Sequence, residues 1–343
     1  MMRLPLSWLL AFTTAALALL LLGSLATGPM TLTLGESLRA LFAGQESGIE
    51  SHKLLIVQEI RLPRTLLCIA VGGILGLCGA VMQGLFRNPL ADPGIIGVSG
   101  GAALGAALAI VLLAPLGQQL QATIGVGLLP LLAFLGGALT TTLVYLLGTR
   151  EGGTSVTVML LAGVAITALS GAVIGLLTYL ADDQMLRNLS LWQMGTLAAG
   201  KPADVALALL TLAAMLWLFM RDANPLNALL LGEGEARHLG VNVQSLKRRL
   251  ILLTAAGVGV AVAVSGMIGF VGLVVPHLVR LLAGPNHVRL LPLSALLGAA
   301  LLLAADMLAR TLLAPAELPV GIITALLGAP FFIWLLVKDR RAL

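Results

Sequence analysis

Residues 93–149 read PGIIGVSGGAALGAALAIVLLAPLGQQLQATIGVGLLPLLAFLGGALTTTLVYLLGT, a run without Asp, Glu, Lys or Arg. An apolar helix needs about 20 residues to cross a bilayer, so these 57 residues are nearly three times too long for one span. Residues 251–279 form a second charge-free run, and 59% of the chain is hydrophobic, against about 45–50% in an ordinary soluble domain. The sequence therefore predicts an all-α, polytopic membrane protein.

The rest of the composition limits what the chain can do outside a membrane. Charged residues make up only 10% and the mean hydropathy is +1.05, so we expect one transmembrane domain over residues 1–343. The net charge is +5, but the basic residues are scattered in short loops without interleaved aromatics, which argues against nucleic-acid binding. The first apolar run, residues 8–25, follows Arg3 and resembles a secretory signal, although its length and the many spans after it favour an uncleaved first helix.

Apolar runs between polar or Pro/Gly breaks predict ten spans. They cover residues 5–27, 65–85, 94–114, 120–148, 155–181, 203–220, 251–264, 269–282, 290–310 and 318–337. The seventh and eighth are the ambiguous pair, because the 29 residues 251–279 exceed one span but are too short for two full ones. Cations flank this region on both sides, so we expect the chain to cross and return, with a break at the glycine-rich residues 265–272.

The distribution of Lys and Arg indicates how the spans are oriented. With ten spans and both termini inside, thirteen of the 20 cations face the cytoplasm, in agreement with the positive-inside rule. Two loops are then long: an outer loop, residues 28–64, whose amphipathic stretch 34–42 suits the membrane interface, and an inner loop, residues 221–247. The inner loop contains LGEGEARHLG at residues 231–240, which predicts two short helices separated by glycines, with the charges facing solvent.

Motifs for chemistry are missing or incomplete. The four histidines have no ligand-like spacing with each other or with Cys68 and Cys78, so we expect no metal site and no enzyme activity. GTLAAGKP at residues 195–202 resembles a nucleotide-binding loop, but Pro202 replaces the Ser or Thr that would hold Mg²⁺. If ATP is used, another chain must bind it.

A few charged residues fall within or beside the predicted spans. Asp306 and Arg310 are four residues apart on one helix face, which suits either a transport pathway or a structural ion pair. Other carboxylates within the spans are scarce, which argues against a proton-driven carrier. RLPR at residues 61–64 begins a span on the outer side, where Arg61 and Arg64 either anchor the helix or form, with Arg310, a cationic ring that docks an acidic partner.

Several motifs resemble one family, the permeases of type II ABC importers for iron chelates, haem and cobalamin. They are RLPR at residues 61–64, QGLFRNPLADP at 83–93, LAGVA at 161–165, the segment 231–240, GFVGLVVPH at 269–277, LAAD at 303–306 and ELPVG at 317–321. The resemblance covers residues 61–338 and includes most of the predicted spans.

The resemblance implies partners and residue roles. It implies a homodimer of ten-helix subunits in the bacterial inner membrane, two ATPase subunits that use ATP and Mg²⁺ on the cytoplasmic side, and a periplasmic binding protein outside. It assigns ATPase coupling to Leu231, Gly232, Glu233, Glu235, Ala236, Arg237, Leu239 and Gly240. It likewise gives Arg61, Arg64 and Arg310 the docking of the binding protein, and Thr154 and Ser155 the inner gate at the start of helix five. No cofactor is expected on this chain.

The substrate is suggested by one segment. Residues 181–195, ADDQMLRNLSLWQMG, are similar to the equivalent stretch of haem importers. We therefore hypothesise that Arg187 attracts haem propionates at the outer mouth, with Trp192 and Met194 giving apolar or soft contacts. A span-flanking cation on a short helix is the alternative interpretation. A ferric siderophore or cobalamin is the alternative substrate, and an ion-coupled secondary carrier is the alternative class of protein.

Overall fold

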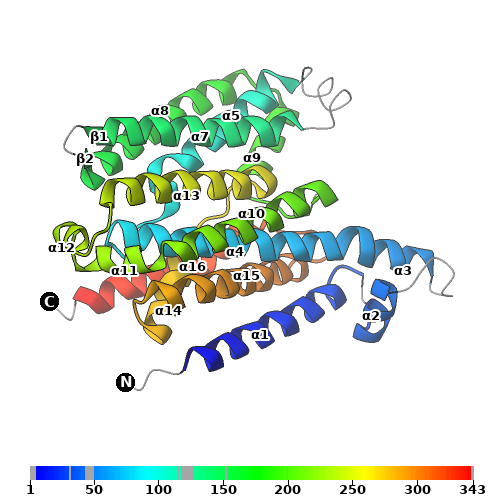
Figure 1. Ribbon diagram of the computed structural model, residues 1–343. Coiled ribbons are helices and arrows are strands. Elements are labelled where there is room, and N and C mark those ends of the chain that lie inside the picture. The colour runs from blue at the N-terminus through cyan, green and yellow to red at the C-terminus, as the bar shows by residue number, and fades with distance from the viewer. Residues whose placement is uncertain are drawn as a thin grey trace.

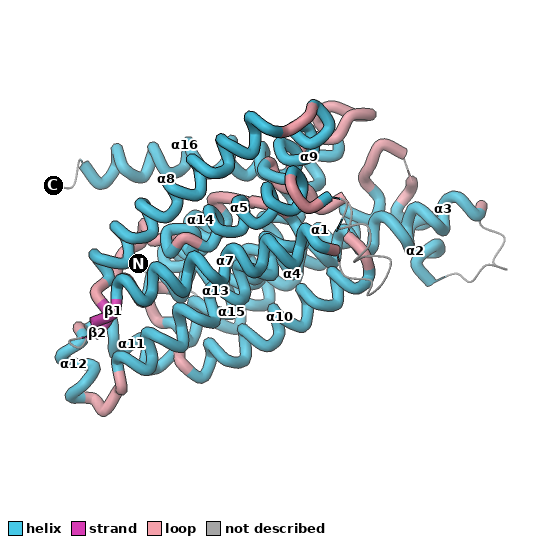
Figure 2. Tube along the Cα trace, turned by 90° about the horizontal axis from the view of Figure 1, so that it is seen from above, coloured by secondary structure: helices cyan, strands magenta, loops and turns pink. Residues whose placement is uncertain are grey.

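A computed structural model describes residues 5–30, 32–42, 50–114, 116, 127–150, 153–198 and 200–340. Figure 1 shows a bundle of long helices that lie roughly side by side, and Figure 2 shows the same bundle turned by 90°. The first half contains α1 (Leu6–Ala26), α2 (Leu34–Phe42), α3 (Ser51–Leu55), the π-helical turn η1 (Ile56–Arg61), α4 (Leu62–Leu85), the 3-10 turn η2 (Pro93–Ile96), α5 (Val98–Val111) and α7 (Leu128–Gly148). The second half contains β1 (Thr149–Arg150), β2 (Gly153–Thr154), α8 (Val156–Leu180), α9 (Asp183–Gln193), α10 (Pro202–Arg221), α11 (Ala223–Leu231), α12 (Glu233–His238), α13 (Val243–Ser265), α14 (Val271–Ala283), α15 (His287–Thr311) and α16 (Val320–Arg340).

The predicted set of about ten spans is confirmed. Among the described residues, seven helical segments are long and apolar enough to cross a membrane, and three shorter apolar helices, α5, α14 and α16, complete the set. The predicted break between the seventh and eighth spans is also present, because α13 ends at Ser265 and α14 begins at Val271. The beginning of the fourth predicted span, residues 120–126, lies outside the described residues.

Two predicted boundaries are wrong, both because a helix starts earlier than its apolar run. Helical structure continues from Ser51 through α3 and η1 into α4, so this helix of 35 residues extends well into the predicted outer loop. Helix α13 begins at Val243 rather than at residue 251, with the Asn242 side chain accepting a hydrogen bond from the Ser245 N–H as its cap. Polar first turns are hidden from a hydropathy pattern, but capping and tertiary contacts make them helical.

The amphipathic stretch at residues 34–42 forms the separate helix α2. Its start is a capping box, in which the Glu36 carboxylate accepts a hydrogen bond from the Thr33 N–H at 2.8 Å and the Thr33 hydroxyl accepts one from the Glu36 N–H at 3.2 Å. The hydrogen bond from Lys53, followed by those from Thr33, lowers the pKa of Glu36 to about 2. The outer loop is therefore an ordered helical unit in the part that the structure describes.

Helix α4 lies at the centre of the bundle, against α10, α13, α14 and α15. Two glycines allow these contacts: a Cβ on Gly72 would lie 2.4 Å from the Gly298 carbonyl oxygen, and one on Gly79 would lie 1.8 Å from the Gly272 carbonyl oxygen. Such close backbone contact between small residues is how helices associate where lipid replaces water. Helices α14 and α15 are therefore both packed closely against α4.

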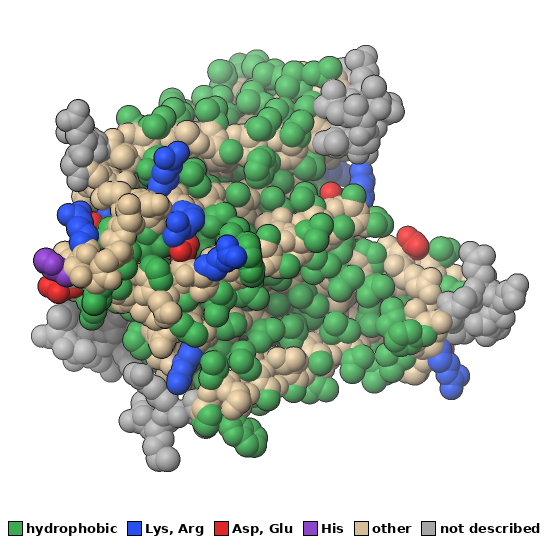
Figure 3. Space-filling view, viewed as in Figure 1, with side chains coloured by type: hydrophobic (Ala, Val, Ile, Leu, Met, Phe, Trp, Pro, Cys, Tyr) green, Lys and Arg blue, Asp and Glu red, His purple; other side chains and the backbone are tan. Residues whose placement is uncertain are grey.

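The surface divides into an apolar middle and two charged ends. Figure 3 shows hydrophobic side chains covering the middle of the bundle, with Lys and Arg mainly toward one end. At this end lie α11, α12, the start of α1 and the end of α16, whereas α2, α3 and α9 lie at the other (Figure 1). This pattern fits a membrane-spanning bundle with short polar caps.

Candidate functional site

The predicted gate residues lie in a tight hairpin between α7 and α8. Strands β1 and β2 pair antiparallel, with Thr149 opposite Thr154. The Thr149 and Thr154 hydroxyls are 3.1 Å apart, and Thr154 is buried. Ser155 is exposed and forms the N-cap of α8, because its hydroxyl accepts from the Val158 N–H and its own N–H donates to the Gly148 carbonyl at 2.8 Å. The hairpin thus sets where α8 begins.

Lys247 of α13 joins this hairpin to the predicted coupling helix. Its ammonium donates to the Thr154 carbonyl at 3.0 Å and to a Glu233 carboxylate oxygen at 2.6 Å. Its side chain is 2% exposed, whereas that of Glu233 is 35% exposed at the start of α12. Gln244 also reaches the hairpin, since its side-chain oxygen accepts from the Thr154 N–H at 3.0 Å. Sequence reasoning placed Lys247 among loop cations and missed this contact.

The inner loop forms two short helices, α11 and α12, as the sequence indicated, and the predicted coupling residues 231–240 cover the end of α11 and all of α12. Gly232, with φ +132°, separates them, and Gly240, with φ +83°, ends the segment. Leu231 and Leu239 are largely exposed, and Ala236 is buried against the bundle. Glu235 and Arg237 face solvent, so the segment presents two apolar side chains among charges. An exposed mixture of this kind suits contact with another protein.

The break between α13 and α14 is held by the segment that follows α9. The Thr196 N–H donates to the Ser265 carbonyl at 2.8 Å, and the same segment is tied to the start of α16, because the Gly321 N–H donates to the Met194 carbonyl at 3.1 Å. Gly266 has φ +68°, and a Cβ there would lie 2.3 Å from the Trp192 carbonyl oxygen. Irregular backbone at membrane depth is tolerated where protein surrounds it, as here.

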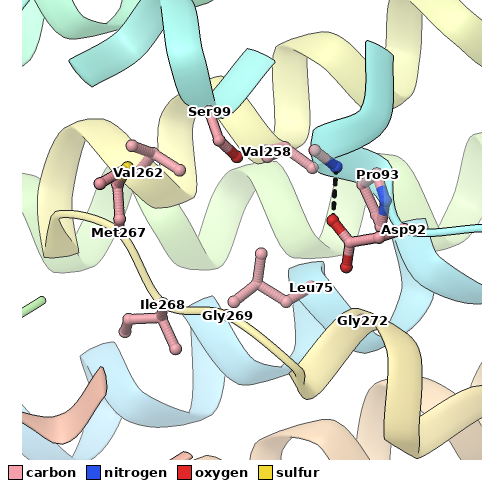
Figure 4. Close-up of a pocket in the computed structure, with 11 residues that line it drawn as sticks. Leu75, Asp92, Pro93, Ser99, Val258, Val262, Met267, Ile268, Gly269 and Gly272 are labelled. Carbon is pink, nitrogen blue, oxygen red and sulfur yellow. Dashed lines mark hydrogen bonds between the residues drawn. The ribbon is translucent and has the colours of Figure 1, made fainter. Parts of the chain in front are cut away.

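A cavity of about 190 Å³ lies beside the break (Figure 4). Apolar side chains from α4, from α13 and from the break line it, and Asp92 and Ser99 contribute polar groups. One oxygen of Asp92 accepts a hydrogen bond from the Gly94 N–H at 2.7 Å. Because pockets for drug-sized ligands measure roughly 300–1,000 Å³, this cavity is too small for a metal chelate.

The three arginines with a predicted docking role are buried toward the end of the bundle that carries α2 and α3, which the sequence predicts to be the outer end. Arg61 donates to the Leu25 carbonyl at 2.7 Å and to those of Ala26 and Met30. Arg310 donates to the Ser24 hydroxyl at 2.8 Å. The three arginines are only 2–6% exposed. The structure therefore brings them together but does not display them as a cationic surface, and their docking role stays a prediction.

Asp306 is the shared partner of two of these arginines. It is fully buried, with Arg64 at 2.9 Å and Arg310 at 3.0 Å. Glu317 also pairs with Arg64, at 2.7 Å. The predicted pair of Asp306 and Arg310 is thus part of a network that fastens α4 to α15, and removing one member of such a network leaves an uncompensated buried charge.

The residues predicted to contact haem separate into exposed and buried. Arg187 and Met194 are exposed, and Arg187 forms no ion pair within the described residues. Trp192 is only 8% exposed and packs into the core, so it is not free for a ligand in this arrangement. The described residues contain no group of three or more His, Cys, Asp or Glu placed to hold a metal ion.

The bundle, its broken helix and the two short helices α11 and α12 at one end are the architecture of a multi-span membrane permease. The family model of the FecCD transport family matches residues 16–338. The chain belongs to this family and is the permease subunit of an ABC importer, not an enzyme.

Similar proteins agree with this assignment. The hemin transport system permease protein HmuU of Yersinia pestis is 47% identical over 336 residues, which cover 97% of this chain and 96% of that protein. The cobalamin import system permease protein BtuC of Halobacterium salinarum is 44% identical and covers 88% of this chain and 78% of its own. A solved chain described as a metal-chelate type ABC transporter, in an inward-facing conformation, has a TM-score of 0.82 at 34% identity and covers 97% of this chain and 99% of its own.

Proposed function

We propose that this permease imports haem. The observation that carries the proposal is the 47% identity to a hemin permease along 97% of the chain. The exposed Arg187 of α9, the short helix that follows α8, adds chemical support, since a guanidinium matches the carboxylates of haem propionates. Met194, also exposed, offers a polarizable thioether nearby.

Cobalamin is the second candidate. It is supported by relatives named as cobalamin and vitamin B12 permeases, which are 40–44% identical to this chain. A ferric siderophore stays a third possibility from the resemblance in the motifs. The identity to the hemin permease is only slightly higher, so the substrate must be decided by transport.

We further propose that the working unit is a homodimer. The 190 Å³ cavity within one chain is smaller than a chelate needs, so the passage would form between two copies. Helix α8 supports this proposal, because only 22% of its most apolar stretch is buried within the chain.

Partners on both faces complete the proposal. Two ATPase subunits would bind α11 and α12 on the cytoplasmic side of the bacterial inner membrane, using ATP and Mg²⁺ that this chain does not bind. Both termini would lie on that side, because the start of α1 and the end of α16 lie at the same end of the bundle as α12. A periplasmic binding protein would dock on the outer end, where Arg61, Arg64 and Arg310 fix the helix ends beneath the docking surface.

Uptake into proteoliposomes tests the substrate. The permease is reconstituted with its ATPase and each candidate binding protein, and uptake of haem, a ferric siderophore and cobalamin is measured with and without ATP. We expect ATP-dependent uptake of haem above the other two. Cobalamin uptake that exceeds haem uptake would establish the second candidate instead, and uptake driven by an ion gradient without the ATPase would contradict the proposed mode of energy supply.

A further inference from the structure

Two parts of the inner end with different expected roles are joined by one buried side chain. Helix α12 is the proposed ATPase contact, and the β1–β2 hairpin carries Thr154 and leads to Ser155, the predicted gate residues. Between them lies Lys247, whose ammonium is 2.6 Å from Glu233 and 3.0 Å from the Thr154 carbonyl oxygen. We propose that Lys247 is a positioning residue that makes the gate hairpin move with α12. The proposal rests on the proposed function, since it concerns how that function is coupled.

Because Lys247 is buried, losing either Glu233 or the Thr154 carbonyl as a partner is unfavourable. A Lys ammonium that is 2% exposed has lost its water and depends on its protein partners. If Glu233 moved away alone, the ammonium would keep the Thr154 carbonyl but lose its charged partner. Hydrogen bonds to charged groups are the stronger kind, so joint movement of α12, Lys247 and the hairpin is favoured over separation.

Helix α13 binds the hairpin through a second side chain. Gln244 lies one turn before Lys247, and its oxygen accepts from the Thr154 N–H at 3.0 Å. Gly153 allows this approach, since it has φ +115° and a Cβ there would lie 2.4 Å from the Gln244 amide nitrogen. Both backbone polar groups of Thr154 are therefore bound by α13, and one of the two bonds is charged and shared with α12.

The elements on either side of this contact suit transmission. Ser155 follows Thr154 directly and caps α8, so a displaced hairpin displaces the start of α8. The far end of α13 leads into the break that begins after Ser265, beside the cavity of about 190 Å³. Packed elements with two discrete arrangements are what carry coupling between sites.

The neighbouring cations show that a role in orienting the protein in the membrane does not require a buried position such as that of Lys247. Arg248 is exposed and forms no ion pair within the described residues, and Arg249 pairs with Asp222 at 2.8 Å while its side chain stays 48% exposed. Any of the three cations would satisfy the positive-inside rule. Among them, Lys247 contacts both α12 and the hairpin, and Arg248 provides a matched control.

The test compares Lys247→Met with Arg248→Met in the complete transporter. The probe is Ser155→Cys, because Ser155 is exposed and the two native cysteines, Cys68 and Cys78, are buried. Labelling by a water-soluble maleimide is followed in nanodiscs with and without a non-hydrolysable ATP analogue. ATP hydrolysis and uptake are measured in proteoliposomes. For Lys247→Met we expect hydrolysis within about twofold of the parent, uptake per ATP lower by about tenfold, and no labelling response to nucleotide.

Two further variants keep the test decisive if Lys247→Met fails to fold. Glu233→Gln removes the charge at the half-exposed end of the contact and should reduce uptake per ATP in the same way. The double variant Lys247→Met/Glu233→Gln should be no worse than either single variant, because both remove one shared interaction. Arg248→Met should behave like the parent in all three measurements.

The outcomes distinguish this inference from the proposed function. A labelling response that persists in Lys247→Met and Glu233→Gln overturns the transmission role and leaves the importer intact. A parent transporter whose Ser155→Cys labelling ignores nucleotide has no gate at the hairpin, which overturns both the gate assignment and the transmission role.

Discussion

Helices α4 and α8 have the same mean hydropathy, 2.3, over their most apolar stretches, but 89% of that stretch is buried in the α4 segment and 22% in α8. The two helices differ in what their glycines contact. Gly79 of α4 meets backbone of α14, whereas Gly171 and Gly175 of α8 meet nothing within 4 Å. Lipid is as apolar as a leucine side chain, so hydropathy places a helix in the membrane, and close packing and polar contacts decide its place in the bundle.

The exposed side of α8 is therefore a surface that this chain alone leaves uncovered. Leu161, Leu169 and Tyr179 are 67%, 66% and 86% exposed. A lipid-facing helix would tolerate this exposure, and so would a helix that faces a second copy or a substrate passage. Variants of the exposed helix α8, compared with variants of the buried helix α4, separate these cases.

The largest effect is expected at the ionic contact of α4. Asp306→Asn should destabilise the protein by about 3–5 kcal/mol, because it leaves Arg64 and Arg310 buried without their shared carboxylate. The loss is measured as the shift in the midpoint of thermal unfolding in detergent, with size-exclusion chromatography as the readout of folded protein. Glu317→Gln is the matched control and should cost less, since the Glu317 side chain is 35% exposed. Equal losses in the two variants would contradict the special role of Asp306.

Backbone contact should give the next largest effect. Gly79→Ala puts a Cβ at 1.8 Å from the Gly272 carbonyl oxygen, so α4 and α14 must separate. We expect a loss of about 1–3 kcal/mol in the same thermal assay. Gly175→Ala should stay within about 0.5 kcal/mol, because a Cβ there meets no atom within 4 Å. A Gly175→Ala variant as unstable as Gly79→Ala would mean that α8 is packed as closely as α4.

The contrast also explains how much the sequence could predict. The spans, the break after Ser265 and the short helices around Gly232 follow from local signals, namely apolar run length and glycine position. The burial of Lys247 does not, because its partner Glu233 is 14 residues away and Thr154 is 93 away. Contacts at such distances along the chain depend on tertiary packing, which leaves no periodic pattern.

The outer arginines illustrate the same limit. Their positions at span ends were visible in the sequence, and so was the spacing of Asp306 and Arg310. Whether they face outward or inward depends on α1, whose carbonyl groups at Leu25 and Ala26 accept from Arg61. A sequence pattern records which residues are charged, but it does not record which backbone groups of a distant helix are free to bind them.

A functional effect without a stability effect is expected on α8. The double variant Gly171→Leu/Gly175→Leu adds bulk to a surface that this chain leaves open. If α8 lines a passage or meets a second copy, uptake should fall by about tenfold while the free energy of unfolding changes by less than about 0.5 kcal/mol. ATP-driven uptake and thermal unfolding are measured on the same preparations. Unchanged uptake would place this side of α8 in lipid.

The smallest effect is expected beyond the outer end of α8, at Arg187 of α9. Exposed ion pairs contribute about 0.2–1 kcal/mol, so Arg187→Ala should raise the apparent KM for haem by a few fold at most and leave the maximal rate unchanged. The effect should shrink as ionic strength rises, because an exposed guanidinium is screened by salt. Lys201→Ala is the control, since Lys201 is also an exposed cation of the outer end. Haem kinetics that are the same in Arg187→Ala and in the parent at low salt would reject a propionate contact and leave Arg187 as a cation that flanks a span.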